Sequence, residues 1–388
     1  MRKNPMRLAI IGTAGVPAKY GGFETLAEQL VLQWQDQFDL TVYNSTHYYR
    51  PEERRPTWEG AKIVYVPIKP NGLQSILYDI WSMIHALLHS DVLLVLGVSG
   101  CIFLPFLKLF SNKQIIVNVD GLEWRRAKWK GLARKFLIYS EQMAIRYADQ
   151  IVADNKAIQK YIHERYNQSS WMIEYGGDHC EQETLSAKLL KKYPFLNKDY
   201  TCSVCRIEPE NNIHLILEAF RISRMPLVII GNWDHSEYGR NLLNQYSKYR
   251  NLHLLPPIYN IRILNQIRSN TSLYIHGHSA GGTNPSLVEA MYLGLPVVAF
   301  DVIYNRITTE GKALYFSDAA DLVQQLLILD DASLREVRQK MQFIAEKRYR
   351  WQVIAQAYAQ IITSNQPAAV PVFDFELPPA LLQAFKVA

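Results

Sequence analysis

Short apolar runs alternate with longer segments of helical periodicity along most of this chain. The helical pattern is clearest over residues 23–38, where Leu26, Leu30, Trp34 and Phe38 recur on one face. Apolar runs separated by amphipathic helices are typical of parallel sheets, whose strands are joined by crossover helices. The pattern therefore predicts an α/β fold of Rossmann-like, doubly wound parallel sheets.

The apolar runs form two series, which predict two domains. A chain of 388 residues is long enough for this, since single cores stop growing below that length. We expect an N-terminal domain over residues 1–178, a linker over 179–199, a C-terminal domain over 200–348, and a segment over 349–388 with a helix crossing back and a tail. The predicted strands are 7–12, 40–44, 62–67, 92–96, 114–119, 150–154 and 171–175, then 201–206, 227–231, 252–255, 272–276, 296–300 and 313–316.

Glycine-rich segments follow several of these strands. Residues 12–15, 176–177, 231–232 and 277–282 each come directly after an apolar run. Doubly wound sheets bind ligands beyond the C-terminal ends of their strands. We therefore expect a ligand site in a central cleft that the two domains face.

The segment GHSAGGTNPSLVEAMYLGLPVVAF, residues 277–300, has the features of an anion site. Gly281 and Gly282 allow a ligand to approach the main chain, and Thr283 or Asn284 can cap the helix that follows. Such a helix directs unpaired N–H groups and its positive dipole end at the ligand, which favours a diphosphate. The alternative is an ordinary turn followed by a solvated helix.

Composition excludes general disorder, because 48% of the residues are hydrophobic and 20% are charged. The net charge of +6 is concentrated in one short basic cluster with aromatic residues between the cations. That mixture favours an anionic membrane surface over nucleic acid, although a solvated helix face is an equal alternative. The cluster comprises Arg125, Arg126, Lys128, Lys130, Arg134 and Lys135 with Trp124, Trp129 and Phe136.

Two apolar stretches bear on location. The run at residues 8–11 is too short for a signal peptide, and the run at 92–107 is too short and too interrupted to span a membrane. We interpret the second as a buried strand, a loop and an apolar helix that contacts lipid. We expect a cytoplasmic protein, peripheral on the inner face of the bacterial plasma membrane.

Cysteines and histidines indicate no metal site. Cys202 and Cys205 have C-x-x-C spacing, but no second pair accompanies them. His276 and His278 end a predicted strand without further ligands nearby, and Asp301 is not part of a D-x-D pattern. We expect neither a metal nor another cofactor.

Four strings in order resemble bacterial glycosyltransferases of the GT-B fold, namely GTAGVPAKYGGFETL, DGLEWRRAKW, RIEPENNIHLILEAF and GHSAGGTNPSLVEAM. They are most similar to the retaining family 4, and within it to rhamnosyltransferases of capsule and O-antigen biosynthesis. The resemblance extends to about residue 363 and implies a nucleotide-sugar donor held mainly by the C-terminal domain.

On the donor side, Arg206 matches the family's arginine that clamps the diphosphate. Glu289 matches the second glutamate of the E-x7-E motif, which accepts hydrogen bonds from the ribose. Two positions depart from the family: Gly281 stands where the first glutamate is usual, and Asn211 stands where a lysine is usual. The resemblance then implies that N–H groups of residues 280–283 replace the missing glutamate and that Arg206 carries more of the diphosphate charge.

On the N-terminal side, Gly12 and Thr13 match the loop that closes over the phosphates, and Gly21 and Gly22 match the loop near the acceptor and the transferred sugar. Asp120 follows a predicted strand and resembles the acceptor-side polar group, with a helix cap as the alternative. Among these residues we expect catalytic roles for Arg206, Asp120 and Glu289.

The resemblance implies a retaining transferase that moves a deoxyhexose, with dTDP-rhamnose as the expected donor, onto a lipid-linked oligosaccharide. A sugar-nucleotide epimerase of the same fold, or a family 4 transferase that uses another UDP- or GDP-sugar, are the alternatives. A nicotinamide-dependent oxidoreductase fits less well, because residues 12–15 lack G-x-G-x-x-G spacing.

Overall fold

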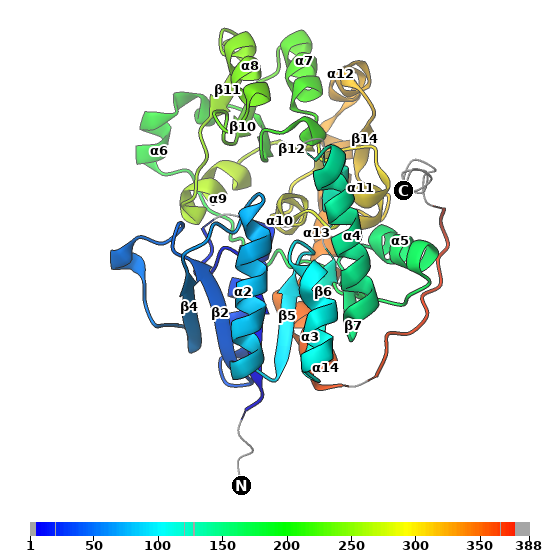
Figure 1. Ribbon diagram of the computed structural model, residues 1–388. Helices are drawn as coiled ribbons and strands as arrows, with labels where there is room; N and C mark the ends of the chain where they lie inside the picture. Colours follow the sequence, from blue (N-terminus) through cyan, green and yellow to red (C-terminus); the bar gives the residue numbers. More distant parts are fainter. Residues whose placement is uncertain (1–4, 20, 120, 127–128, 365, 377–388) are drawn as a thin grey trace. The chain divides into compact units, whose positions relative to one another are not determined.

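The computed structural model describes residues 5–19, 21–119, 121–126, 129–364 and 366–376. The chain forms two compact units, the first made of residues 1–174 and 351–388 and the second of residues 175–350 (Figure 1). The segment 179–199, expected as a linker, is part of the second unit and contains a short helix. The helix after residue 350 belongs to the first unit.

The first unit contains a sheet in which, among described residues, eight strands follow the order β3-β4-β2-β1-β5-β6-β7-β8. Every pairing is parallel except that of β3 with β4, so the predicted parallel sheet is confirmed. The two-residue strand β3 was not predicted. The strands are β1 (Arg7–Ile11), β2 (Asp39–Ser45), β3 (Thr57–Trp58), β4 (Ala61–Val66), β5 (Val92–Leu96), β6 (Gln114–Val119), β7 (Gln150–Ala153) and β8 (Trp171–Met172).

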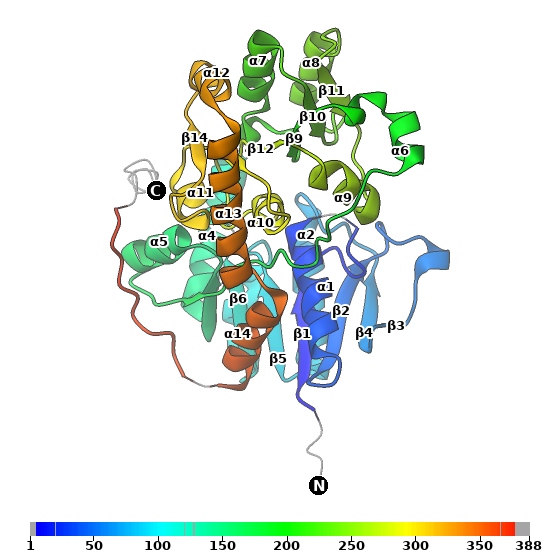
Figure 2. The ribbon, with the colours of Figure 1, turned by 180° about the vertical axis from the view of Figure 1, so that it is seen from behind.

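Helices cover both faces of this sheet. Right-handed crossovers in opposite directions place α1 on one face and α2, α3 and α4 on the other (Figures 1 and 2). The late helix α14 packs against α1, where Trp34 Nε1 donates to the Ala355 carbonyl at 3.3 Å. The helices are α1 (Gly22–Trp34), η1 (Pro51–Glu53), α2 (Gln74–His89), η2 (Cys101–Phe103), α3 (Leu104–Phe110), η3 (Glu123–Arg125), α4 (Gly131–Tyr147), α5 (Lys156–Tyr166) and α14 (Trp351–Thr363).

The second unit contains a parallel sheet whose strands follow the order β11-β10-β9-β12-β13-β14. The strands are β9 (Thr201–Val204), β10 (Leu227–Ile230), β11 (Leu252–Leu255), β12 (Leu273–His276), β13 (Val297–Phe300) and β14 (Leu314–Phe316). The helices are α6 (Ala187–Lys192), η4 (Pro194–Asn197), η5 (Pro209–Asn211), α7 (Ile213–Ser223), α8 (Glu237–Tyr246), α9 (Ile261–Ser269), α10 (Pro285–Tyr292), α11 (Ile303–Thr308), α12 (Ala319–Ile328) and α13 (Asp331–Arg348).

The strand order fixes where each sheet can bind a ligand. From β9 the chain moves outward through β10 to β11 and then returns to β12, on the other side of β9. The first sheet reverses in the same way between β1 and β5. Crossover helices diverge at such a switch point and leave an open crevice beyond the strand ends. The loops after β1, β5, β9 and β12 are therefore the places to look for function.

Candidate functional site

The loops after β9 and β12 are bonded to each other at the switch point of the second unit. Asn212 donates its side-chain amide to the Gly277 carbonyl at 2.9 Å, and the Ser279 N–H donates to the Glu210 carbonyl at 2.8 Å. A Cβ at Gly277 would lie 2.2 Å from the Asn211 carbonyl oxygen, so only glycine permits this approach. The loop that carries Arg206 and the glycine-rich loop therefore form one surface.

Arg206 lies in the loop after β9. The side chain is partly buried, and its guanidinium has no hydrogen bond or ion pair with any described residue. Asn211 is buried and donates its amide to the Arg206 carbonyl at 2.6 Å. Asn211, expected to contact the donor, thus fixes the main chain that carries Arg206, while the guanidinium remains available to an anion.

The glycine-rich loop after β12 leaves main-chain donors unused. Gly281 has φ +119°, and within residues 129–364 the N–H groups of Gly281 and Gly282 donate no hydrogen bond. Asn284 is the N-cap of α10 but its side chain makes no capping hydrogen bond, so the Ser286 N–H in the first turn is also uncapped. Thr283 is buried beside them. Together with the helix dipole, these N–H groups suit a phosphate.

Glu289 lies one turn into α10 and is the centre of a buried polar network. Its Oε2 accepts from Arg268 Nη1, and its Oε1 lies 3.3 Å from His179 Nε2. Arg268 is fully buried at the end of α9 and also donates from Nη2 to Cys180 Sγ at 3.2 Å. The network therefore joins α9, α10 and the segment after residue 174.

The hydrogen bonds and charges in this network favour the charged forms of Glu289 and His179. Burial by itself would raise the pKa of Glu289, but the charge of Arg268 and the hydrogen bond from His179 lower that pKa to about 2. Burial would lower the pKa of His179, but hydrogen bonds to Cys180 and Glu289 raise it to about 10. At neutral pH the carboxylate is thus flanked by two cations.

This arrangement limits what Glu289 can bind. A carboxylate has about four lone-pair positions, and the two protein partners leave some of them for ribose hydroxyls. The ligand atoms of His179, Cys180 and Glu289 lie within 4.8 Å of one another, a spacing that can hold a metal ion. The buried guanidinium of Arg268 contacts two of these three side chains and would repel a divalent cation. The network is better suited to hold Glu289 in place.

The loop after β1 is also glycine-rich, but four of its N–H groups are occupied. A Cβ at Gly12 would lie 2.1 Å from the Leu96 carbonyl oxygen, so this glycine is needed for close packing of the loops after β1 and β5. Thr13 is buried. Four loop N–H groups each donate to a side chain of the same unit: Gly15 to Thr13, Ala14 to Glu24, Val16 to Asn44 and Ala18 to Glu28.

The remaining predicted residues of the first unit lie close to α1. Gly21 has φ +111° and precedes α1, which begins at Gly22. Asp120, the expected acceptor-side group, lies outside the described residues.

The basic cluster is less open than its sequence suggests. Arg126 pairs with Glu123 at 2.7 Å, and the Arg134 guanidinium lies 5.2 Å from the ring centre of Trp124, which is buried. Lys128 lies outside the described residues. Part of the cluster thus stabilises the segment before α4. Among described residues, no helix has the length and apolarity needed to cross a bilayer.

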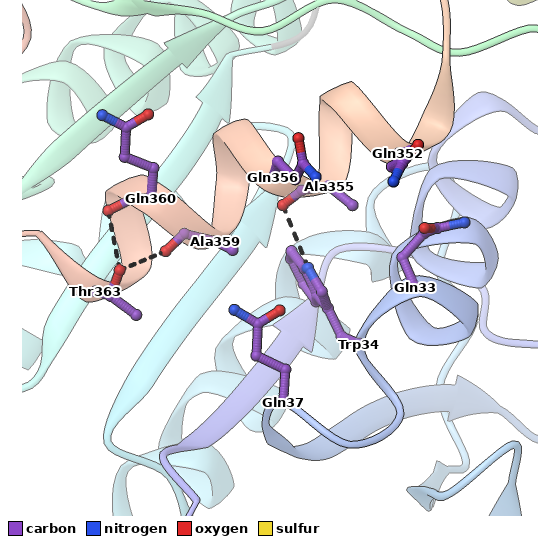
Figure 3. A pocket seen from close by; sticks show the side chains of 9 residues that line it. All are labelled: Gln33, Trp34, Gln37, Gln352, Ala355, Gln356, Ala359, Gln360 and Thr363. Atoms are coloured by element: carbon purple, nitrogen blue, oxygen red, sulfur yellow. Dashed lines mark hydrogen bonds between the residues drawn. The ribbon is translucent and has the colours of Figure 1, made fainter.

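A groove between α1 and α14 has a volume of about 420 Å³ (Figure 3). Five glutamines line it together with Trp34, Ala355, Ala359 and Thr363, and none of these residues ionises at ordinary pH. The Trp34 indole is already bonded to the Ala355 carbonyl. The groove lacks the cationic groups that a diphosphate needs.

Three members of the Glu289 network were missed in the sequence. His179 and Cys180 were expected to be part of a linker or the core, and Arg268 lies on an amphipathic helix with other polar residues. The pair Arg268 and Cys180 is separated by 88 positions, so no local spacing reveals the contact. The burial of Arg268 at the end of α9 is visible only in the fold.

Comparisons with known proteins agree with this geometry. Residues 187–341 match the family described as glycosyl transferases group 1, and residues 6–178 match a domain of unknown function, DUF1972. No curated protein sequence matches the chain at a significant level.

Solved structures show the same fold at low sequence identity. Sucrose-phosphate synthase from Thermosynechococcus elongatus has a TM-score of 0.76 at 14% identity, covering 92% of this chain and 98% of that one. Anabaena HepE in complex with UDP-glucose has a TM-score of 0.69 at 14% identity, covering 92% and 99%. A trehalose-6-phosphate protein from E. coli bound with UDP-2-fluoro glucose has a TM-score of 0.68 at 11% identity, covering 92% and 98%. The predicted fold of two parallel-sheet units, GT-B, is confirmed.

Proposed function

We propose that this chain, a glycosyltransferase with a group 1 domain over residues 187–341, binds a nucleoside diphosphate sugar at the switch point of its second unit. The diphosphate would contact the Arg206 guanidinium and the free N–H groups of Gly281 and Gly282. Glu289 would accept hydrogen bonds from the ribose. Group 1 assignment and the nucleotide-sugar complexes of structural neighbours, HepE with UDP-glucose among them, support a donor of this class.

The reaction we propose is transfer with retention at the anomeric carbon. The acceptor oxygen forms a bond to the anomeric carbon while the bond between that carbon and the diphosphate oxygen breaks. The departing diphosphate takes the proton of the acceptor hydroxyl. Arg206 and the loop N–H groups stabilise the negative charge that gathers on the leaving group. In the first unit, the loop at Gly12 and Thr13 would close over the phosphates, and the loop at Gly21 and Gly22 would lie near the acceptor and the sugar. Asp120 remains our candidate for the acceptor side.

The finer assignment follows the resemblance of the sequence motifs. We propose a deoxyhexose as the transferred sugar, rhamnose from dTDP-rhamnose, and a lipid-linked oligosaccharide of capsule or O-antigen biosynthesis as the acceptor. Gly281 supports a sugar with fewer hydroxyl contacts, since a residue without a side chain stands where the family has a glutamate. The expected location is the inner face of the plasma membrane, where the enzyme would work without a metal or other cofactor.

The observation that carries the proposal is the unpaired Arg206 guanidinium beside uncapped N–H groups of the second unit. The experiment is a thermal-shift screen of dTDP-, UDP- and GDP-sugars, followed by product analysis with a short lipid-linked acceptor. We expect stabilisation by a nucleotide sugar and a glycosylated product that retains the anomeric configuration. Conversion of the donor without any acceptor would instead identify an epimerase, and no stabilisation by any donor would contradict the proposed site.

A further inference from the structure

The outer surface of α2 is unusually apolar. Leu77, Trp81, Ile84 and Leu88 recur at positions i, i+4, i+7 and i+11, which places them on one face of the helix. Each of these side chains is between 40% and 76% exposed. A helix that covers a sheet normally turns its polar face outward. An apolar outer face of this kind indicates a surface that binds a partner.

The neighbouring helix α3 continues the surface. Phe106, Leu109 and Phe110 are between 58% and 79% exposed. Both helices lie on the same face of the first sheet, opposite α1 and α14 (Figures 1 and 2). We call these seven side chains of α2 and α3 the apolar stripe.

The exposed charges on α2, α3 and α4 that have no ion-pair partner are of one sign. The only carboxylates within α2, α3 and α4 are Asp79 and Glu141, and both are buried. On α4, beside α3, the exposed charges are those of Lys135 and Arg146. Lys108 on α3 pairs with Asp149 beyond the helices. The three helices thus present apolar side chains flanked by cations, with no exposed carboxylate among them.

This chemistry fits a bilayer that contains anionic lipids. Apolar side chains on a helix that lies in the interface enter the boundary between head groups and acyl chains, and nearby Lys and Arg side chains bind anionic head groups. A second copy of the chain would bring like charges together at Lys135 and Arg146, which disfavours self-association through the same surface.

We propose that the apolar stripe of α2 and α3, with the cations of α4, is the surface that docks this enzyme on an anionic membrane. This inference rests on the proposed location at a membrane and assigns the main contact to the apolar stripe, with only Lys135 taking part from the basic cluster at residues 124–136. There, Arg126 and Arg134 are engaged with Glu123 and Trp124. On the stripe, insertion of apolar side chains supplies most of the attraction.

The test uses co-sedimentation of the full chain with vesicles of phosphatidylglycerol and phosphatidylcholine, and with vesicles of phosphatidylcholine alone. A triple variant of the stripe, Leu77→Gln, Ile84→Gln and Leu88→Gln, should bind the anionic vesicles at least about tenfold more weakly than wild type. The matched control is Leu327→Gln with Ile328→Gln on α12, where two side chains of similar exposure lie in the other unit. That control should bind as wild type does.

Three results would overturn the proposal. These are failure of the wild-type chain to bind anionic vesicles, unchanged binding of the triple variant, and a wild-type dimer that the triple variant converts to a monomer. The last would identify a second copy as the partner.

A second measurement does not depend on the triple variant. Trp81 lies in the middle of the stripe, so lipids brominated on their acyl chains should quench fluorescence of wild type but quench less in Trp81→Phe. Equal quenching in the two proteins would contradict insertion at α2. Donor stabilisation and transfer to a short soluble acceptor should be unchanged in the triple variant. If those activities are absent from wild type while vesicle binding follows the stripe, the proposed function fails and the docking surface stands.

Discussion

The loops after β1 and after β12 look alike in sequence, since both are rich in glycine and both follow a central strand at a switch point. Their hydrogen bonding differs. Four N–H groups of the first loop donate to side chains of its own unit, whereas Gly281 and Gly282 in the second donate to no described residue. Glycine content therefore identifies two similar loops. The hydrogen bonds of their N–H groups indicate that the second loop has donors left for an anion.

The cations near the two loops also differ in whether they have a protein partner. Lys19, which follows the first loop, donates to the Tyr48 carbonyl at 3.0 Å and pairs with Glu53 at 2.8 Å. Arg206, beside the second loop, has no such partner among described residues. Among the described residues of these two loops, a diphosphate would therefore find an unpaired cation together with unpaired N–H groups at the loops after β9 and β12.

Substitution of a glycine by alanine should have very different effects on unfolding free energy in the two loops. We expect Gly12→Ala to cost about 4 kcal/mol of unfolding free energy or more, because its Cβ would overlap the Leu96 carbonyl. Gly281→Ala meets no atom closer than 3.6 Å, so it should cost only about 1 kcal/mol from its positive φ while weakening donor binding. Urea unfolding and calorimetry of donor binding measure the two effects. A stable Gly12→Ala protein would show that the first loop is not tightly packed.

The buried pair of Arg268 and Glu289 should also be sensitive to substitution. Arg268→Met leaves the Glu289 carboxylate buried without its main partner and should destabilise the chain by about 3 kcal/mol. The double variant Arg268→Met with Glu289→Gln should recover part of this loss, because the uncompensated charge is then removed. Additive losses in urea unfolding would show that the pair does not interact.

Removal of the unpaired cation should affect activity more than stability. Arg206→Ala should lower kcat/KM about a hundredfold, equivalent to about 2.7 kcal/mol, through loss of charge stabilisation on the leaving diphosphate. Arg206→Lys should recover part of the activity, and Lys19→Ala should change kcat/KM little. Equal losses in Arg206→Ala and Lys19→Ala would remove the contrast between the two loops.

The effect of pH on the free energy of unfolding should be the smallest of these effects, and it reports on His179 and Glu289 specifically. His179 has its pKa raised to about 10 in the fold, so its contribution to stability is complete below pH 6.5 and is lost as pH rises through 10. Glu289 has its pKa lowered to about 2, so its contribution is complete above pH 4.5 and is lost as pH falls. We expect wild type to lose on the order of 2 kcal/mol between pH 6.5 and 10, and His179→Asn to lose less. Parallel curves for the two proteins would contradict the protonated His179.

The sheets could be predicted from sequence because their strands are buried on both faces and read as continuous apolar runs. The strand ends were harder to predict: the strand expected at 201–206 ends at Val204, although the Cys205 N–H still donates to the Ile230 carbonyl of β10. Strand β3 has only two residues and no apolar run, so no pattern marks it. The helix expected over 23–38 ends at Trp34, although Phe38 still packs its ring against the Trp34 indole.

The candidate site was accessible to sequence reasoning only in part. The N–H groups of 281–282 follow from local pattern, because a glycine pair before a helix is a contiguous feature. Arg206 was identified by the resemblance of its motif to glycosyltransferases. The roles of Asn211 and of the Arg268 network depend on contacts between distant segments, such as those that join Cys180, Arg268 and Glu289. The apolar stripe on α2 has the period of a buried helix face, and only its exposure in the fold shows that it lacks a partner.

The central claim is that the diphosphate binds at the loop after β12. Selective labelling of glycine with ¹⁵N gives amide signals for the 19 glycines, and titration with dTDP or UDP reports which of them meet the phosphates. We predict large amide shifts for Gly281 and Gly282 and a small one for Gly15, whose N–H already donates to Thr13. Shifts confined to Gly12 and Gly15, with Gly281 and Gly282 unmoved at saturation, would contradict the account.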